Sequence, residues 1–384
     1  MAEAYIVEAV RTAGGRRNGR LSGVHPADLA GDVLTGLVSR AGIDPGSVED
    51  VVLGCVTQVG EQSFAFARNA VLASSLPITV PAVTVDRQCG SSQQAVQFAA
   101  QAIMSGTQDI VIAAGAESMS RVPMLSNQGS GTGPISDRIR QRFGVRGFSQ
   151  FEGAEMMASK YGYSRETLDR FALHSHQLAA AAMAAGAFDR EIVPIAIATA
   201  EGPDLHTVDE GVRPDSTLEK IGTVKTLVDG GVVTAANASQ ICDGASAILV
   251  VSERALKDHG LTPIARVHAM TVSAGDPVIM LEEPIAATQR LLQRAGMSID
   301  EIDLYEVNEA FAPVPLAWLE VLKADPARLN VHGGSIALGH PLGSSGTKLM
   351  STLVHALRRR GKRYGLQTMC EAGGIANATI IEAL

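Results

Sequence analysis

Short runs of apolar, often β-branched residues alternate along the chain with longer segments whose apolar positions recur at helical spacing. In the clearest example, VTVDRQ turns at CGSS into the helical pattern QQAVQFAAQAIMSG, and the apolar run DIVIAAGAE follows. Strands that alternate with helices in this order form parallel sheets covered by the helices. The pattern therefore predicts an α/β protein.

The same unit occurs twice in the chain. AGIDPGSVEDV at 41–51 resembles AGMSIDEIDLY at 295–305, with Val48 and Ile302 in register at an offset of 254 residues. This offset also places Cys89 over Gly343. Two further correspondences support the duplication: Ala116 and Glu117 with Cys370 and Glu371, and AYIVEAVRTAG at 4–14 with ARVHAMTVSAG at 265–275. We expect two like halves packed around a pseudo-two-fold axis, in the layer order α/β/α/β/α.

The segment 119–240 has no counterpart in the second half. It begins with many Gly, Ser and Pro residues and continues with an Ala-rich helical pattern. Long insertions beside a ligand crevice often form lids or binding subdomains. We therefore expect an N-terminal half at 1–118 plus 241–263, an inserted loop domain at 119–240 for substrate binding and subunit contacts, and a C-terminal half at 264–384.

Composition narrows the function classes. With 384 residues and 46% hydrophobic content, the chain can bury more than one core. It has neither a signal-peptide pattern nor a long apolar run, so we expect a soluble, cytoplasmic protein with no membrane span. The net charge of −8 argues against nucleic acid as a partner. Four cysteines without a Cys-x-x-Cys pair, and histidines without paired spacing, argue against a disulfide framework and a metal site.

Two side chains are candidates for thiol chemistry. Cys89 stands at the start of a predicted helix, where the helix dipole favours a thiolate, so we expect a lowered pKa for this thiol. His340 lies between glycine and proline in a predicted turn at the same crevice, where it can act as a base. Cys55, in a strand-like run, and Cys242, at a predicted helix start, are interpreted as packing residues.

Each candidate also has a purely structural interpretation. Taken alone, Cys89 is as compatible with packing as with catalysis, His340 with a turn histidine, and Asn308 with a cap of the following helix. Arg358 to Arg363 are most simply cations at a helix C-terminus.

Four motifs together resemble the thiolase family: CGSS at Cys89, NEAFA at 308–312, GHPLGSSG at 339–346, and CEAGG at 370–374. They occur in the family's order along the whole chain, with RTAGG near the start and TAANAS at 234–239. The resemblance implies a thiolase-like fold and transfer of an acyl group between CoA thioesters.

The resemblance also implies roles for residues. Cys89 would be the nucleophile, His340 would activate it and help bind the thioester oxygen, Asn308 would position a water in an oxyanion hole, and Cys370 would be the acid and base at the α-carbon. The backbone N–H groups of Cys89 and Ala372 would be oxyanion donors. Ala235, Ser239, Ala310, Phe311 and Arg213 match positions that contact CoA, and the basic segment Arg138 to Arg146 would help to hold its phosphates.

No tightly bound cofactor is implied, since coenzyme A is a substrate and product, and members form homodimers or homotetramers. Because Cys89 and Cys370 would face one crevice, we also consider a reversible disulfide between them.

Two departures from the family pattern bear on the substrate. Ala372 replaces a glycine of the usual Cys-x-Gly-Gly-Gly turn, and SQFEGAE at 149–155 stands where many short-chain biosynthetic members have a His-Met-Gly stretch. We therefore expect a degradative 3-ketoacyl-CoA thiolase of actinobacterial type, acting in β-oxidation of fatty acids or of bulky or cyclic acyl chains. The alternatives are a biosynthetic acetyl-CoA acetyltransferase and a non-catalytic acyl-CoA-binding protein. A ketoacyl synthase would use Cys-His-His, whereas this chain has Cys at 370.

Overall fold

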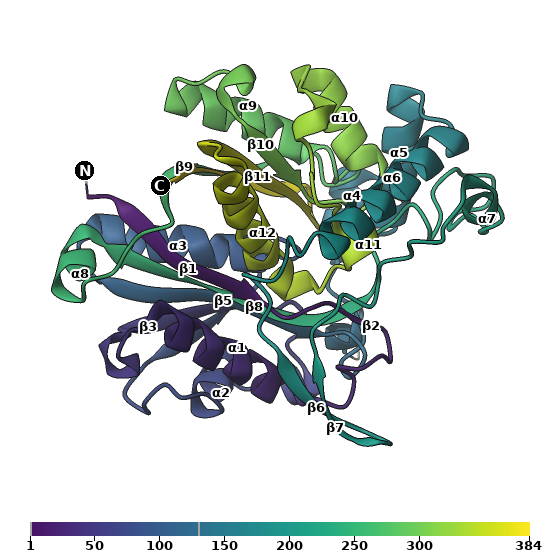
Figure 1. The fold of residues 1–384 in the computed structure, drawn as a ribbon. Helices are drawn as coiled ribbons and strands as arrows, with labels where there is room; N and C mark the ends of the chain where they lie inside the picture. The colour runs from purple at the N-terminus through teal and green to yellow at the C-terminus, as the bar shows by residue number, and fades with distance from the viewer. Residues whose placement is uncertain (1, 130) are drawn as a thin grey trace.

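The computed structural model describes residues 2–129 and 131–384. Its main sheet has the strand order β10-β11-β12-β9-β1-β8-β5-β3-β4, with the short β2 paired to β8, and β6 and β7 form a separate hairpin. Helices lie on both faces of each half of this sheet (Figure 1). The fold is of the predicted α/β class.

The strands have the following bounds: β1 Ala4–Arg11, β2 Gly15–Arg16, β3 Asp50–Gly54, β4 Ala82–Val85, β5 Ile110–Ser118, β6 Ile195–Thr199, β7 Gly202–His206, β8 Cys242–Ser252, β9 Ala265–Ala274, β10 Leu304–Val307, β11 Tyr364–Glu371 and β12 Ile375–Ala383. The α-helices have these bounds: α1 Pro26–Ala41, α2 Phe66–Leu72, α3 Ser91–Ser105, α4 Asp137–Phe143, α5 Gln150–Tyr161, α6 Arg165–Ala184, α7 Leu218–Gly222, α8 Glu253–Asp258, α9 Glu283–Ala295, α10 Pro313–Leu322, α11 Ser335–Leu338 and α12 Ser345–Arg360.

The duplication seen in the sequence is present in the structure. Helices α3 and α12 begin at Ser91 and Ser345, and strands β5 and β11 begin at Ile110 and Tyr364, so both pairs keep the offset of 254 residues. α1 and α2 cover the outer face of the first half, α9 and α10 cover the outer face of the second, and α3 and α12 pack against each other between them. This arrangement gives five layers, as the repeat predicts.

The sheet is less parallel than the sequence pattern indicates. β3 is parallel to β4 and β5, and β10 is parallel to β11, but β8, β1, β12 and β9 are antiparallel to their neighbours. One cause is visible in the second half, where only the short turn at 372–374 joins β11 to β12. A turn this short connects antiparallel strands, whereas a parallel pair needs a long crossover.

The two central helices approach most closely at their first turns. Thr347 N donates a hydrogen bond to Ser92 Oγ (3.0 Å). A Cβ atom added to Gly346 would lie 2.0 Å from the backbone nitrogen of Gln93, so only glycine fits at this crossing. The crossing brings the turn at Cys89 and the turn at Gly343 to the same end of the central layer.

The segment between β5 and β8 contributes α4 to α7 and the β6–β7 hairpin. Side chains of α5 and α6, including Met157 and Leu168, join the core of the C-terminal half. β8 then pairs with β1 and β5 in the N-terminal half. The proposed division into three domains stays a prediction.

The two ends of the chain lie near each other (Figure 1). Arg266, on β9, forms ion pairs with Glu3 and with Glu382, which stand close to the first and the last residue. Of the helices described, none is long and apolar enough to cross a membrane.

Candidate active site

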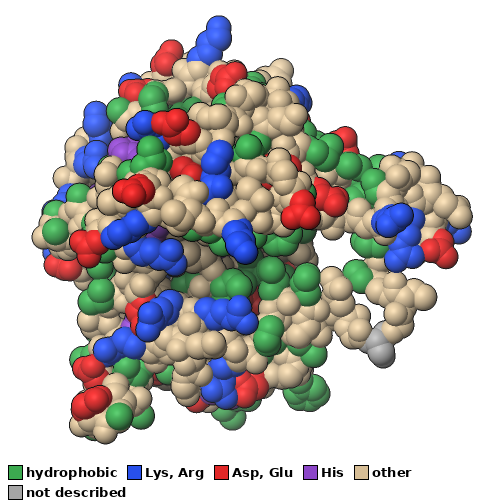
Figure 2. All heavy atoms as spheres, turned by 90° about the vertical axis from the view of Figure 1, so that its right-hand side faces the viewer, with side chains coloured by type: hydrophobic (Ala, Val, Ile, Leu, Met, Phe, Trp, Pro, Cys, Tyr) green, Lys and Arg blue, Asp and Glu red, His purple; other side chains and the backbone are tan. Residues whose placement is uncertain are grey.

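A pocket of about 470 Å³ lies at the end of the central layer where the two turns meet. Figure 2 shows a hollow on this side of the molecule, with hydrophobic side chains in its floor and Lys or Arg side chains near its rim. The lining agrees with this picture and comprises Arg16, Arg17, Met119, Met124, Gln150, Phe151, Arg213, Leu227, Ala235, Ala238, Ser239, Gln240, Ile241, Ala310, Phe311, His340 and Leu342.

Cys89 is half-buried in a tight turn that ends at α3. The preceding Gln88 has φ +49°, a left-handed conformation that is uncommon outside glycine. Asp86 Oδ1 accepts a hydrogen bond from Gln88 N (2.7 Å), which holds this turn. Cys89 packs against a small apolar cluster that includes Met119 and Leu342, and both of these line the pocket. The turn therefore places Cys89 behind two residues of the pocket wall, and Cys89 itself does not line the pocket.

The expected thiolate is not favoured in the resting site. Burial and the nearby Glu371 carboxyl raise the pKa of Cys89 to about 12, although its own backbone N–H acts in the opposite direction. The prediction of a lowered pKa from the helix N-terminus was therefore wrong, because burial and a neighbouring carboxyl are invisible in the local sequence. A base must remove the proton when the thiol reacts.

His340 is a buried, neutral imidazole whose Nδ1 is in hydrogen-bond contact with a serine hydroxyl. Burial and the charge of Lys348 lower its pKa to about 3. Ser345 Oγ donates to Pro341 O (2.9 Å), so it accepts a hydrogen bond from His340 Nδ1 (2.5 Å). Since Nδ1 carries the proton, Nε2 has the lone pair, which faces Asn308 Nδ2 and can accept a proton. The lowered pKa makes His340 a weak base in the resting site, so it can take the thiol proton only as the sulfur bonds to the substrate.

Asn308 lies beside this histidine. Its Nδ2 is 3.5 Å from His340 Nε2, and its Oδ1 accepts a hydrogen bond from Ser335 Oγ (2.6 Å), which fixes the orientation of the amide. Asn308 is not the cap of the following helix, since α10 begins only at Pro313. The amide N–H groups therefore point into the region of the histidine, where an oxyanion or a water can bind.

Cys370 is the penultimate residue of β11 and is fully buried. Its pKa is raised by burial and by the nearby Cys89 and Glu371, which places the two cysteines in one electrostatic environment. Both are free thiols here, so the hypothesis of a disulfide stays a prediction. In the following turn, Gly373 and Gly374 have positive φ whereas Ala372 does not, so alanine replaces the first glycine without strain.

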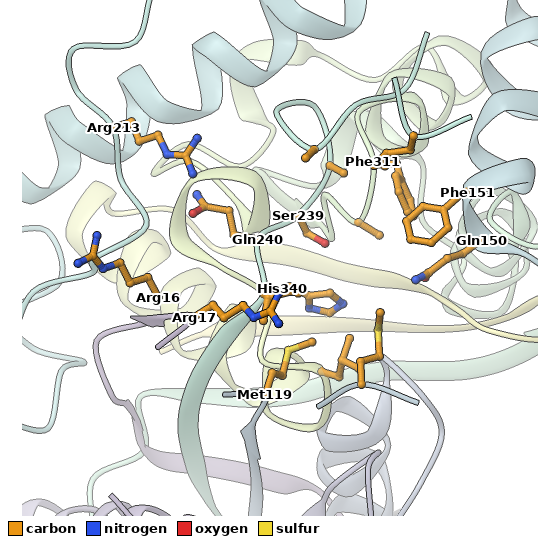
Figure 3. Close-up of a pocket in the computed structure, with 17 residues that line it drawn as sticks. Arg16, Arg17, Met119, Gln150, Phe151, Arg213, Ser239, Gln240, Phe311 and His340 are labelled. Atoms are coloured by element: carbon orange, nitrogen blue, oxygen red, sulfur yellow. The ribbon is translucent and has the colours of Figure 1, made fainter. Parts of the chain in front are cut away.

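The five predicted CoA contacts all line the pocket: Arg213, Ala235, Ser239, Ala310 and Phe311. Figure 3 shows Arg213 with Arg16 and Arg17 on one side of the pocket and Phe311 with Phe151 on the other, with His340 between them. The Phe151 and Phe311 rings are 5.8 Å apart in an edge-to-face arrangement.

Sequence reasoning missed several wall residues. Arg16 and Arg17 directly follow the RTAGG motif, and Phe151 lies in the SQFEGAE stretch. These two sequence motifs could have indicated that the three residues line the pocket. The basic segment Arg138 to Arg146 does not line this pocket in the described structure; Arg140 pairs instead with Asp137 in α4. Its predicted contact with CoA phosphates stays a prediction.

The other two cysteines are buried packing residues, as predicted. Cys55 follows β3 directly, and Cys242 is the first residue of β8 rather than the start of a helix. Across residues 2–129 and 131–384, no group of three or more His, Cys, Asp or Glu side chains is arranged to hold a metal ion.

Comparisons with known proteins show what the chain is similar to. Residues 4–254 match the family described as thiolase, N-terminal domain, and residues 261–383 match thiolase, C-terminal domain. A steroid 3-ketoacyl-CoA thiolase (FadA6) of Mycobacterium tuberculosis is 53% identical, covering 100% of this chain and 95% of the relative. An acetyl-CoA acetyltransferase of Escherichia coli is 41% identical, covering 100% of both. The structure of human mitochondrial 3-ketoacyl-CoA thiolase aligns with a TM-score of 0.91 at 37% identity, covering 100% of this chain and 99% of that one.

The fold and the matched domains define an enzyme of the acyltransferase class. More specifically, the chain belongs to the thiolase family. The resemblance inferred from four motifs is thereby confirmed, and coenzyme A is the substrate that this family shares.

Proposed function

We propose that the protein is a degradative 3-ketoacyl-CoA thiolase that uses Cys89 as its nucleophile. The observation that carries this proposal is the neutral His340, which lines the same pocket as Met119 and Leu342, the residues of the cluster against which Cys89 packs. Relatives named 3-ketoacyl-CoA thiolase, with 53% and 39% identity over the whole chain, support it.

In the first half-reaction, His340 Nε2 takes the proton of Cys89 as the sulfur attacks C3 of a 3-oxoacyl-CoA. The bond between C2 and C3 then breaks, and the electron pair stays on C2 as the enolate of acetyl-CoA. Cys370 donates its proton to C2, so acetyl-CoA leaves and the shortened acyl chain remains on Cys89. Asn308 and a backbone N–H provide hydrogen bonds where negative charge develops on oxygen.

In the second half-reaction, the thiol of free CoA returns a proton to Cys370 and attacks the thioester on Cys89. Cys89 leaves as a thiolate and recovers the proton held by His340. A sulfur nucleophile suits this sequence because the intermediate is itself a thioester and keeps the reactivity of the substrate. After one cycle each protein group is back in its starting protonation state.

The charges around the pocket suggest how CoA lies in it. Arg16, Arg17 and Arg213 form its cationic side, and guanidinium groups bind phosphate oxygens well. The acyl group on Cys89 would lie against Met119 and Leu342. An acidic protein can therefore bind an anionic ligand through local charge.

The pocket and the relatives favour a bulky acyl group. Gln150 and Phe151, from the stretch in which this chain departs from short-chain members, form part of the wall. The relative at 53% identity is named a steroid thiolase. We propose that 3-oxoacyl-CoAs with long or cyclic chains are cleaved faster than acetoacetyl-CoA.

The main rival is synthesis of acetoacetyl-CoA by the same residues, which the acetyl-CoA acetyltransferase relative favours. Steady-state thiolysis with a panel of 3-oxoacyl-CoAs of increasing length and bulk separates the two. We expect kcat/KM to rise with chain size, and a strong preference for acetoacetyl-CoA would contradict the degradative role.

A non-catalytic acyl-CoA-binding role is tested by mass spectrometry. Wild type mixed with acetyl-CoA should gain one acetyl group on Cys89, whereas Cys89→Ser should fold, lose turnover and gain none at that position under the same conditions. Folded wild type without adduct or activity would favour the binding role, and normal thiolysis by Cys89→Ser would refute the assignment of the nucleophile.

We further propose that the protein forms a homodimer or homotetramer. β4 is an edge strand, and large apolar side chains nearby are exposed, namely Phe64 (90%), Ile78 (77%) and Val83 (48%). Light scattering of the purified protein measures the assembly, and a monomer would contradict this proposal. The cytoplasmic location stays a prediction.

A further inference from the structure

The duplication places a glutamate at the same point in each half. Glu117 lies near the end of β5 and Glu371 at the end of β11, and the offset of 254 residues relates them. Both side chains are fully buried. A carboxyl group in such a position requires partners or a shifted pKa, so the two environments can be compared directly.

Glu117 holds the main chain of neighbouring turns. Its carboxylate accepts hydrogen bonds from Val56 N (2.9 Å), Thr57 N (3.0 Å), Gln62 Nε2 (2.9 Å) and Gly343 N (2.9 Å). Gly343 is the counterpart of Cys89 in the other half. In the first half, both oxygens of the duplicated carboxylate therefore accept hydrogen bonds that hold neighbouring turns in place.

Glu371 lies under the opposite turn but is largely unengaged. Its Oε1 accepts one hydrogen bond, from Asn377 N (3.0 Å), and its buried Oε2 has no partner among the described residues. The carboxyl packs on Gly90, where an added Cβ would lie 1.9 Å from Oε1. The residue next to the nucleophile must therefore be glycine for this carboxyl to fit.

Charged and titratable groups surround Glu371 on several elements. Arg87, in the Cys89 turn, favours its ionised form and has a buried Nε without a partner in the described structure. An ionised Glu371 raises the pKa of Cys89 and of Cys370, while Glu117 and Asp86 act on Cys89 more weakly. Among the carboxyl groups that the structure describes, Glu371 is thus the one that raises the pKa of both cysteines.

We propose that Glu371 is a positioning residue that sets, through its own charge, the cost of forming negative sulfur on Cys89 and Cys370. Burial raises the pKa of Glu371 to about 8, so the group is neutral below that pH and an anion above it. The neutral form permits transient thiolates during turnover, whereas the anion opposes them. This inference rests on the proposed roles of the two cysteines.

The test measures the initial rate of alkylation of Cys89 by iodoacetamide between pH 7 and 13, a range that includes the expected wild-type midpoint, with the site identified by mass spectrometry. In Glu371→Gln, which cannot become an anion, the midpoint of the alkylation profile should fall by about one pH unit or more relative to wild type. Glu371→Asp keeps the charge and should stay near the wild-type midpoint. A Gln variant with the wild-type midpoint, or equal shifts in Gln and Asp, would overturn the proposal.

Two further measurements keep the outcomes distinct. Glu117→Gln removes the structural counterpart, and it should lower the melting temperature while moving the Cys89 midpoint less than Glu371→Gln does. If Glu371→Gln does not fold, Arg87→Gln tests the same proposal. Loss of the cation should raise the pKa of Glu371 and so change the alkaline part of the alkylation profile. An unchanged profile would overturn the proposal. Alkylation needs no turnover, so this test can fail while acetylation of Cys89 still succeeds, and the reverse.

Discussion

Ser345 fixes the proton on His340, and this single hydroxyl decides which nitrogen of the imidazole can act as a base. The hydroxyl is itself held by Pro341 O, so the direction of both hydrogen bonds is set. Lys348 holds the same loop by donating to Leu338 O (2.6 Å) and Gly339 O (2.8 Å). The GHPLGSSG motif thus contains the base and most of the groups that orient it.

Ser345→Ala should therefore lower kcat without abolishing folding. Loss of a buried hydrogen-bond partner costs about 1 to 3 kcal/mol, which corresponds to about a 5- to 150-fold lower rate if the cost falls on the transition state. Steady-state thiolysis and acetylation of Cys89 measure the effect. As a control, Ser345→Thr retains the hydroxyl and should keep more activity; equal activity of all three proteins would contradict the role of Ser345.

At the residue scale, the sequence predicts which residues form the site better than it predicts their pKa values. Cys89, His340, Asn308 and Cys370 could be found because each stands in a recognisable turn motif. The raised pKa of Cys89 could not, because it depends on burial and on Glu371, which lies 282 positions further along the chain. Arg17 and Phe151 were missed for a related reason, since a pocket wall assembles segments that share no local pattern.

Helices α3 and α12 are the elements that join the two halves of the site. Cys89 lies in the turn just before α3, and His340 lies in the loop just before α12. The distance between the two helices therefore affects how the thiol and the imidazole face each other. Sequence periodicity predicted both helices and their correspondence. It could not predict the antiparallel strands, because strand direction depends on connections and packing rather than on the apolar pattern.

Gly346→Ala should destabilise the protein at this crossing. The new methyl group would lie 2.0 Å from Gln93 N, and overpacking of this kind typically costs about 1 to 3 kcal/mol or more. Chemical denaturation followed by circular dichroism measures the loss. Gly222→Ala, in α7 with open space around the glycine, is the matched control and should change stability little. Equal stabilities of the two variants would contradict the tight crossing.

At the scale of the whole molecule, the net charge of −8 contrasts with the cationic side of the pocket. If Arg16, Arg17 and Arg213 bind CoA phosphates, added salt should screen them, and the KM for CoA should rise with ionic strength while kcat changes less. Arg17→Gln should raise KM at low salt and flatten this dependence. A substitution at the distant, exposed Arg170 is the control, and a KM independent of salt in wild type would contradict the assignment.

Arg11 links the inserted segment to the N-terminal half. Fully buried on β1, it pairs with Glu191 (2.5 Å) and Asp209 (2.8 Å), both in the insertion. Arg11→Met leaves two buried carboxylates without their cation and should cost about 3 to 5 kcal/mol of stability at pH 7, whereas the exposed pair of Arg170 should contribute less than about 1. Denaturation curves of both variants provide the measurement, and a small loss for Arg11→Met would count against this linkage.

The ion pair of Arg11 with Asp209 also predicts how the stability of the fold changes with pH. Burial alone would raise the pKa of Asp209, but the charge of Arg11 outweighs it, and the folded-state pKa is lowered. The stabilisation is therefore present above the unfolded value of about 4 and is lost as the pH falls through the folded value. Wild type should lose more stability than Arg11→Met on acidification below about pH 4.

The ion pairs of Arg266 with Glu3 and Glu382 suggest how the chain could be circularly permuted. Because one guanidinium holds both ends of the polypeptide, a short linker should join them without disturbing β1, β9 or β12. New ends could then be opened at the exposed Glu201, in the turn between β6 and β7, outside the main sheet. Such a circular permutant would begin and finish inside the insertion and leave the duplicated halves as one uninterrupted stretch of chain.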